Sequence, residues 1–331
     1  MLKLLIDDRW IGPNGIGRYA REVTDRFSLE RVSVTGLGKV WPIKSPLTPI
    51  YLSGAITRLR PDIFWSPGFI PPAISRIPFV ITIHDLIHLQ FGSQAQKLYY
   101  NSVIRPLSKK AFRIVTVSEY SRREIINWTG LNEDQVAVAL NGVSSQFTVD
   151  GPRLNVGRPY LLYVGNRRKH KNLDRMVRAF AASQISQDIV LALSGDPDGQ
   201  LVTLAKQVGV ADRLLFLGKV DDKDLSSVYR GALGLVFVSL YEGFGLPTLE
   251  AMSCGTPVLT SNITASVEIA GDAAICVDPY NIDDIAQGID RLINDVELRK
   301  ALHTAGIERA RTFTWGRTAG IVWDVLRDAA A

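Results

Sequence analysis

The chain has 331 residues, of which 46% are hydrophobic, and its formal net charge is +5. This length and apolar content suffice for a large core and predict about two domains. No run of about 18 apolar residues occurs, which excludes a membrane-spanning helix. Met1–Trp10 turns acidic too early for a signal peptide, so we expect none. Two cysteines, Cys254 and Cys276, form no disulfide framework or metal cluster, so we expect a reducing cytosol and no metal.

Short β-branched runs alternate with longer amphipathic segments along the chain, a pattern typical of parallel sheets covered by helices. In the first half we expect strands at Leu2–Ile6, Ile63–Trp65, Phe79–Ile83 and Ile114–Val117. Helices are expected there at Gly17–Phe27 and Gln94–Ala111. In the second half we expect strands, each followed by a helix, at Tyr160–Gly165, Ile189–Gly195, Leu214–Gly218, Gly234–Leu240 and Val258–Ser261.

The segment Thr148–Pro159 is polar, contains Gly and Pro, and has no periodicity, which indicates a linker. It separates the two series of expected strands, and neither series contains a short-period repeat. The sequence therefore predicts an α/β fold of two doubly wound domains that are joined near residue 150.

The stretch LYEGFGLPTLEAMSCGTPVLTS (Leu240–Ser261) lies at the end of one expected strand and carries two carboxylates, Glu242 and Glu250. A helix is expected at Leu246–Cys254, so the loop YEGFG follows the carboxyl end of a strand, where open α/β sheets bind ligands. Its two glycines allow the backbone to approach a ligand closely. The free N–H groups of the following helix favour an anion such as a diphosphate.

Taken alone, Glu242 can be a solvated loop residue and Glu250 a first-turn charge that favours the helix dipole. The complete string EGFGLPTLEAMSCGTPVLTS is far more specific. It closely resembles the Glu-x7-Glu signature of retaining GT-B glycosyltransferases, a large nucleotide-sugar family that includes bacterial mannosyl- and rhamnosyltransferases. The resemblance implies a GT-B fold, in which two Rossmann-like domains face each other across a cleft, and it implies that the two glutamates recognise a sugar donor.

The resemblance covers most of the chain. In the first half GIGRYAREV, ITIHDLIHL, VTVSEYSRREI and LNGV match family landmarks in order, and in the second half YVGNRRKHKNLDRMVRAF, ALSGD, LFLGKV and SVEIAGDAAICVDP do so. It implies an acceptor-binding domain at 1–150, a donor-binding domain at 158–314, and a terminal segment at 315–331 that packs back on the first domain. His170 departs from the family, which commonly has Arg before the Lys-Asn pair that Lys171 and Asn172 match.

The resemblance also assigns roles to single residues. The residues expected to act in catalysis are Glu242, Lys171, His84, Arg167 and Arg168, where either arginine supplies the charge missing at His170. The residues expected to bind the donor nucleotide are Gly15, Gly17, Asn166, Gly195, Lys219, Val220, Gly243, Phe244, Gly245, Leu246, Thr248 and Glu250. We expect Glu242 to hold hydroxyls of the donor sugar and Glu250 to hold the ribose.

The implied activity is a retaining, metal-independent transfer of a hexose, best from GDP-mannose, to a growing surface glycan such as O-antigen or to a lipid-diphosphate-linked acceptor. No cofactor is expected. The alternatives are a UDP-sugar or rhamnosyl donor, a nucleotide-sugar epimerase, a sugar phosphorylase with a lysine-bound pyridoxal cofactor, and an inactive sugar-binding protein. The intact set of Glu242, Lys171 and Glu250 argues against the inactive protein.

Two weaker signals have simpler explanations, and the two histidines of HDLIHL have different expected roles. GIGRYA fits the dinucleotide fingerprint G-x-G-x-x-A, but its glycines come about eight residues after the first strand, too late for a Rossmann dehydrogenase. Asp196–Asp198 (DPD) fits a turn better than a metal-binding Asp-x-Asp. His84 follows an apolar strand directly and is expected to reach the cleft, whereas His88 is expected to pack.

The positive charge is concentrated in the first half. Residues 1–150 contain 18 Lys and Arg against 12 Asp and Glu, and the remainder contains 20 against 21. The charges can be solvated helix faces, or they can meet an anionic lipid or a phosphate-bearing acceptor at the inner face of the plasma membrane. The residues expected at this surface are Arg18, Lys109, Lys110, Arg113 and Arg122. Of these, Lys109, Lys110 and Arg113 lie on or just after a helical segment that has Leu98, Tyr99, Val103, Ile104 and Leu107 on one face. No nucleic-acid partner is expected.

Overall fold

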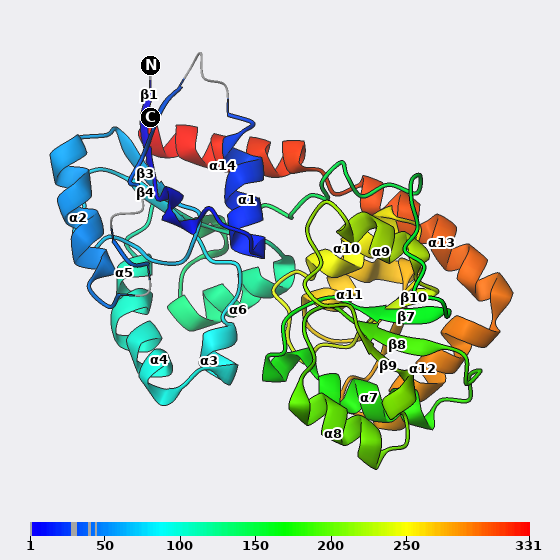
Figure 1. Cartoon of the computed structure of the whole chain (residues 1–331). Helices are drawn as coiled ribbons and strands as arrows, with labels where there is room; N and C mark the ends of the chain where they lie inside the picture. Colours follow the sequence, from blue (N-terminus) through cyan, green and yellow to red (C-terminus); the bar gives the residue numbers. More distant parts are fainter. Residues whose placement is uncertain (1, 28–31, 39–40, 44) are drawn as a thin grey trace. The chain divides into compact units, whose positions relative to one another are not determined.

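The computed structural model describes residues 2–27, 32–38, 41–43 and 45–331. The chain forms two compact units, Met1–Gly142 together with Thr314–Ala331 (unit 1) and Val143–Phe313 (unit 2). Within the described residues, each unit contains one six-stranded parallel sheet with helices packed against it (Figure 1). The expected α/β fold with two doubly wound sheets is confirmed. Among the described residues of both units, no helix is both long and apolar enough to span a bilayer.

The sheet of unit 1 has the strand order β2-β1-β3-β4-β5-β6. Its strands are β1 (Leu2–Ile6), β2 (Val32–Gly36), β3 (Ile63–Ser66), β4 (Phe79–Thr82), β5 (Arg113–Thr116) and β6 (Val136–Val138). Its helices are α1 (Gly15–Thr24), α2 (Thr48–Leu59), α3 (Ile87–Phe91), α4 (Gln94–Tyr99), α5 (Arg105–Ser108), α6 (Glu119–Thr129) and α14 (Trp315–Ala330).

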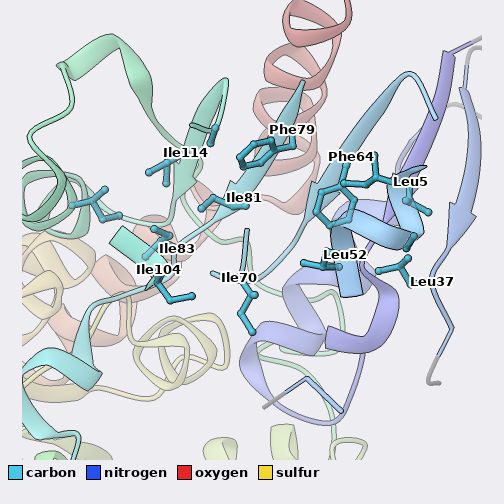
Figure 2. Packing of buried hydrophobic residues seen from close by; sticks show 14 of the residues in the cluster. Leu5, Leu37, Leu52, Phe64, Ile70, Phe79, Ile81, Ile83, Ile104 and Ile114 are labelled. Carbon is cyan, nitrogen blue, oxygen red and sulfur yellow. The ribbon is translucent and has the colours of Figure 1, made fainter. Parts of the chain in front are cut away.

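One face of this sheet carries a hydrophobic core. Leu5 of β1, Phe64 of β3, Ile81 of β4 and Ile114 of β5 lie in one cluster with Leu52 of α2, and each is at most 1% exposed (Figure 2). Alternate residues of the same strands, such as Leu4 and Val80, are equally buried on the other face. Burial on both faces is why these strands read as short continuous apolar runs in the sequence.

The last helix, α14, belongs to unit 1. It buries Trp315, Ala319, Val322 and Leu326, which recur at the spacing of one helix face. Trp315 meets the edge of the Tyr19 ring at a centroid distance of 6.2 Å. α14 is the segment that the resemblance expects to return to the first domain.

The long helix expected at Gln94–Ala111 is not regular. A π-helical turn at Tyr100–Ile104 separates α4 from α5, and the helical run ends at Ser108. A π-turn shifts the register of the side chains that follow it. The single apolar face expected there is therefore wrong: Ile104 is fully buried, but Leu98 is 67% exposed.

The sheet of unit 2 has the order β12-β11-β10-β7-β8-β9. Its strands are β7 (Tyr160–Tyr163), β8 (Val190–Leu193), β9 (Leu214–Phe216), β10 (Gly234–Phe237), β11 (Val258–Ser261) and β12 (Ile275–Val277). Its helices are α7 (Leu173–Ala182), α8 (Gly199–Gln207), α9 (Leu225–Gly231), α10 (Leu246–Ser253), α11 (Ala265–Ala270), α12 (Ile282–Asn294) and α13 (Val296–Arg311).

The segment expected as a linker is part of unit 2. The buried Arg230 of α9 donates hydrogen bonds to the carbonyls of Thr148 and Pro152 at 3.0 and 2.8 Å. The Leu154 N–H donates to the carbonyl of Ser227 at 2.9 Å. A polar, non-periodic segment is thus fixed to α9 by hydrogen bonds from the Arg230 side chain and from its own backbone, and the units divide after Gly142 rather than near residue 150.

Candidate active site

The order of the second sheet reverses between β7 and β10, because β8 and β9 follow on one side and β11 and β12 on the other. β7 and β10 are parallel neighbours, so both chains leave the sheet at the same carboxyl edge. Open α/β sheets bind their ligands at such a switch point. Lys171 follows β7 and Glu242 follows β10, and these residues, 71 positions apart in the sequence, meet there.

Lys171 and Glu242 form a shielded ion pair. Lys171 Nζ donates to Glu242 Oε1 at 2.6 Å, and each side chain is 11% exposed. Nζ also lies 4.9 Å from the centre of the Phe237 ring. Removal of one partner from such a pair leaves the other charge uncompensated, at a cost of about 3–5 kcal/mol. The pair therefore fixes both side chains at the switch point before a ligand binds.

Asn172 fixes the backbone next to Lys171. Its φ is +61°, in the left-handed region that Asn tolerates better than most residues. Its Nδ2 donates to the carbonyls of Val238 and Pro279 at 3.0 and 2.7 Å, which ties the start of α7 to the ends of β10 and β12. In the Lys-Asn pair, the lysine therefore carries the charge and the asparagine holds it in place.

The loop after β10 is buried and leads directly into α10. Tyr241–Gly245 is buried throughout, and Phe244 meets the edge of the Phe313 ring at 6.0 Å. Gly245 has φ +99°, a conformation that favours glycine. α10 then starts at Leu246, with a proline in its first turn. The expected donor residues Gly243, Phe244, Gly245, Leu246 and Thr248 thus form one continuous turn next to Glu242.

Glu250 lies inside unit 2, in α10. Its residue is 4% exposed, and the Tyr229 hydroxyl of α9 donates to its Oε2 at 2.8 Å. One carboxylate oxygen is therefore already engaged by a protein group. Sequence reasoning missed Tyr229, because nothing in the sequence indicates which residue of another helix reaches a buried glutamate.

Two buried hydroxyls near the loop that follows β10 have no hydrogen-bond partner among the described residues. Ser239 follows β10 and is 0% exposed, and Ser266 lies in the first turn of α11 and is 2% exposed. Buried polar groups are normally paired, with protein, water or ligand. The unpaired hydroxyls of Ser239 and Ser266 can therefore form hydrogen bonds with water or a ligand at the carboxyl edge near β10 and β11.

The two arginines after β7 differ in their surroundings. Arg167 Nη2 donates to the carbonyls of Ser194 and Asp196 at 2.9 and 3.2 Å, and its guanidinium lies over the Phe216 ring. Its Nη1 is buried without a partner in the part of the chain that the structure describes. Arg168 is exposed. Arg167 is thus held toward the ends of β8 and β9, and Arg168 is the more exposed cation.

The remaining expected donor residues of unit 2 lie at the same carboxyl edge. The carbonyl of Asn166 accepts the Tyr163 hydroxyl at 2.7 Å. Gly195, with φ +90°, donates its N–H to the carbonyl of Gly218 at 2.7 Å. Lys219 and Val220 follow directly, and the Lys219 side chain is 88% exposed.

In unit 1 the expected glycines start α1. Asn14 caps this helix, because its Oδ1 accepts the Gly17 N–H at 2.9 Å. A side chain at Gly17 would place its Cβ 2.2 Å from the Gly12 carbonyl oxygen, so the close approach requires glycine. Gly15 is exposed and Arg18 is partly buried.

His84 follows β4 in unit 1 and is held in one tautomer. Its Nε2 lies 2.9 Å from the Pro67 carbonyl oxygen, so this nitrogen carries the proton and donates. The ring packs edge-on against Tyr19 at a centroid distance of 4.7 Å. Burial lowers the pKa of His84 to about 4, so the imidazole is neutral near pH 7 and Nδ1 is left as an acceptor. His88 packs against the Phe69 and Tyr100 rings.

The expected basic surface is only partly realised. Lys109 and Lys110 are exposed. Arg113, however, opens β5 and lies 3.6 Å from Asp328 of α14, and Arg122 pairs with Glu119 and Glu133. Lys109 and Lys110 therefore follow α5 as exposed cations, whereas Arg113 and Arg122 are each engaged by carboxylates.

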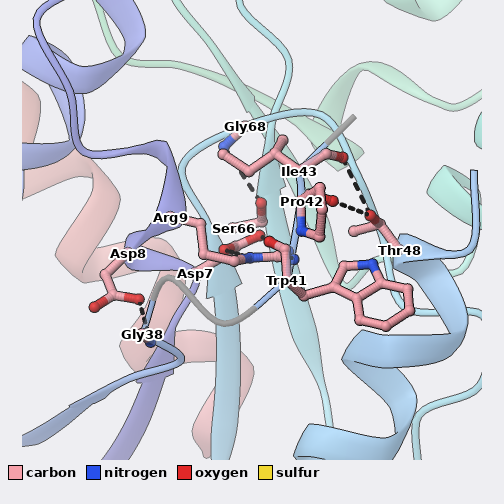
Figure 3. A network of polar contacts seen from close by, with 10 residues as sticks. All are labelled: Asp7, Asp8, Arg9, Gly38, Trp41, Pro42, Ile43, Thr48, Ser66 and Gly68. Atoms are coloured by element: carbon pink, nitrogen blue, oxygen red, sulfur yellow. Dashed lines mark hydrogen bonds and ion pairs between the residues drawn. The ribbon is translucent and has the colours of Figure 1, made fainter. Parts of the chain in front are cut away.

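A buried ion pair in unit 1 escaped sequence reasoning. Asp7, at the end of β1, accepts two hydrogen bonds from Arg9 at 2.6 and 2.7 Å, and Arg9 also reaches the Trp41 carbonyl (Figure 3). Burial raises the pKa of Asp7 despite the nearby guanidinium. The only sequence signal is the abrupt change from an apolar strand to IDDRW.

No group of three or more His, Cys, Asp or Glu side chains in the described ranges could hold a metal.

The sequence matches two described families. Residues 146–309 match "Glycosyl transferases group 1", and residues 10–147 match "Glycosyltransferase Family 4". O-antigen chain mannosyltransferase B of Escherichia coli is 29% identical over 287 residues, which are 81% of this chain and 75% of that protein.

Solved structures share the fold. Sucrose-phosphate synthase from Thermosynechococcus elongatus superimposes with a TM-score of 0.79 at 19% identity and covers 98% of each chain. HepE from Anabaena, in complex with UDP and glucose, superimposes with a TM-score of 0.78 at 17% identity over 99% of this chain and 100% of that chain.

Proposed function

Because the chain belongs to the glycosyltransferases of group 1, we propose that it moves a hexose from a nucleotide sugar to a glycan acceptor, with retention at the anomeric carbon and without a metal. The observation that carries this proposal is the Lys171–Glu242 pair at the switch point of the second sheet. A cation and a carboxylate in contact there suit a ligand that has both a diphosphate and a hydroxyl-bearing sugar.

The charges of the reaction match this arrangement. Cleavage of the anomeric C–O bond leaves negative charge on the diphosphate and positive charge on the sugar ring. Lys171, Arg168 and the N–H groups at the start of α10 then stabilise the diphosphate, and Glu242 holds sugar hydroxyls. We propose attack of the acceptor from the face that the diphosphate leaves, with the departing phosphate accepting the acceptor's proton.

GDP-mannose is the donor we favour. The name of the E. coli relative, a mannosyltransferase, supports mannose, whereas the complex of HepE with UDP and glucose supports a UDP-sugar as the second candidate. A rhamnosyl donor and nucleotide-sugar epimerisation are the remaining alternatives. An epimerase would convert the nucleotide sugar in the absence of any acceptor.

For the acceptor we propose a growing surface glycan, such as O-antigen, or a lipid-diphosphate-linked glycan, met at the cytoplasmic face of the membrane. Unit 1 has the excess of basic residues. Most of the exposed large apolar side chains among the described residues also belong to unit 1, and they are Leu47, Ile50, Leu59, Ile74, Phe91, Leu98 and Phe112. Apolar and basic side chains on one unit suit peripheral attachment to an anionic bilayer.

The test is donor cleavage on a panel of nucleotide sugars, with and without EDTA. We expect GDP-mannose to be used fastest, EDTA to leave the rate unchanged, and the glycoside formed when an acceptor is added to keep the α configuration by NMR. Glu242→Gln should lower turnover by about 10²–10³-fold, comparable to the loss of a group that stabilises transition-state charge. Lys169→Gln is the matched control, since it changes a neighbouring lysine outside the ion pair. Strict metal dependence or a β-linked product would overturn the scheme.

A further inference from the structure

Thr264, between β11 and α11, has a backbone conformation that side chains rarely adopt. Its φ is +60° and its ψ is −152°. This region is populated almost only by glycine, and a β-branched residue is especially disfavoured in it. Such strain persists only where the surrounding structure imposes it, and it is typical of functional sites.

The neighbours of Thr264 are firmly anchored. Ser261 Oγ donates to the carbonyl of Ser239 at 2.6 Å, and the Asn262 N–H donates to the carbonyl of Val277 at 2.8 Å. These bonds tie the end of β11 to the ends of β10 and β12. The chain must then turn within two residues to start α11 at Ala265.

Thr264 and Ala265 hold both peptide groups of Glu242. The Glu242 N–H donates to Thr264 Oγ1 at 3.4 Å, and the Ala265 N–H donates to the Glu242 carbonyl at 3.4 Å. Each bond is long, but together they restrain the backbone of Glu242 from both sides. The carboxylate of this same residue pairs with Lys171.

We propose that Thr264 is a positioning residue for transfer: its strained backbone presents the hydroxyl that sets Glu242 against Lys171 and the donor sugar. The inference rests on the proposed function of Glu242. Glycine would adopt the same φ and ψ without strain, so the threonine is retained for its hydroxyl. The strained conformation of Thr264 is thus the one in which its hydroxyl accepts the Glu242 N–H.

Three substitutions separate the hydroxyl from the strain. Thr264→Ser keeps the hydroxyl. Thr264→Val keeps the β-branched shape, and with it the strain, but has no hydroxyl. Thr264→Gly removes both the hydroxyl and the strain. We expect Thr264→Ser to retain most of the turnover, and Thr264→Val and Thr264→Gly to lose about 10- to 100-fold, as for a small displacement of a reacting group. Thr264→Gly should nevertheless raise the melting temperature by about 2–4 °C, because it relieves strain.

Two measurements exclude a general structural effect. The nucleoside diphosphate without its sugar should bind all variants with the wild-type Kd, because Glu242 is proposed to contact the sugar. Hydrogen exchange of the Glu242 amide should be faster in Thr264→Val and unchanged in Thr264→Ser. Full turnover in Thr264→Val and Thr264→Gly, or unchanged exchange in Thr264→Val, overturns the proposal. A wild-type protein that cleaves no nucleotide sugar overturns the proposed function instead, and the exchange experiment then still decides whether Thr264 restrains Glu242.

Discussion

At the scale of single residues, His84 shows how burial selects one protonation state. The Pro67 carbonyl holds the proton on Nε2, and burial lowers the pKa from 6.5 to about 4. The unfolded chain therefore binds a proton at His84 below about pH 6.5, while the folded chain does so only near pH 4. This contribution to stability is complete above pH 6.5 and is lost as the pH falls toward 4.

We predict that the free energy of unfolding of the wild type falls by about 2 kcal/mol between pH 6.5 and 4 because of this residue. His84→Gln keeps an amide N–H for the Pro67 carbonyl and cannot titrate, so its stability should fall less over the same range. Urea unfolding at both pH values measures the difference. Equal pH dependence in the two proteins would show that His84 titrates normally in the fold.

At the scale of elements, α14 completes unit 1 although it follows the whole of unit 2 in the sequence. Trp315 is 2% exposed, and Thr318 Oγ1 donates to the Leu140 carbonyl at 2.5 Å. We predict that Trp315→Ala destabilises unit 1 by about 3–5 kcal/mol, as for other buried aromatic residues. Arg317→Ala on the exposed face of the same helix should cost less than about 0.5 kcal/mol.

Tryptophan fluorescence reports this unfolding selectively. All six tryptophans lie in residues 1–142 and 314–331, so the signal follows unit 1 alone. The urea midpoint of the fluorescence change should therefore fall in Trp315→Ala and stay in place in Arg317→Ala. A wild-type midpoint in Trp315→Ala would mean that α14 contributes little to unit 1.

At the scale of the whole molecule, the uneven charge predicts where the protein associates. We predict binding to vesicles that contain anionic lipid at low salt and release at high salt, because exposed charges are screened. Lys109→Glu with Lys110→Glu should abolish this binding, whereas Lys206→Glu with Lys223→Glu, the same charge change on exposed residues of unit 2, should leave it intact. Arg113 is left unchanged because it pairs with Asp328. Sedimentation with vesicles measures the binding of the wild type and of both double variants. If the wild type does not bind anionic vesicles at low salt, a soluble acceptor is favoured.

Much of this protein is determined by local sequence. β1 and β11 have the bounds that the sequence predicts, Leu2–Ile6 and Val258–Ser261, because each contains a buried apolar run, Leu4–Ile6 and Val258–Leu259. The loop YEGFG and the following helix were predictable for the same local reason, since glycine and proline restrict the backbone without help from distant residues. The family resemblance rests on such local strings.

Other features depend on which segments the fold brings together. The Lys171–Glu242 contact exists because β7 and β10 are neighbours, and the strain at Thr264 exists because β11 is anchored on both sides. The π-turn at Tyr100–Ile104 and the fixing of Thr148–Pro152 by Arg230 contradicted expectations from pattern alone. Sequence patterns record the preferences of a residue for its near neighbours, whereas these features arise from hydrogen bonds and packing between residues far apart in the chain, which only the tertiary structure decides.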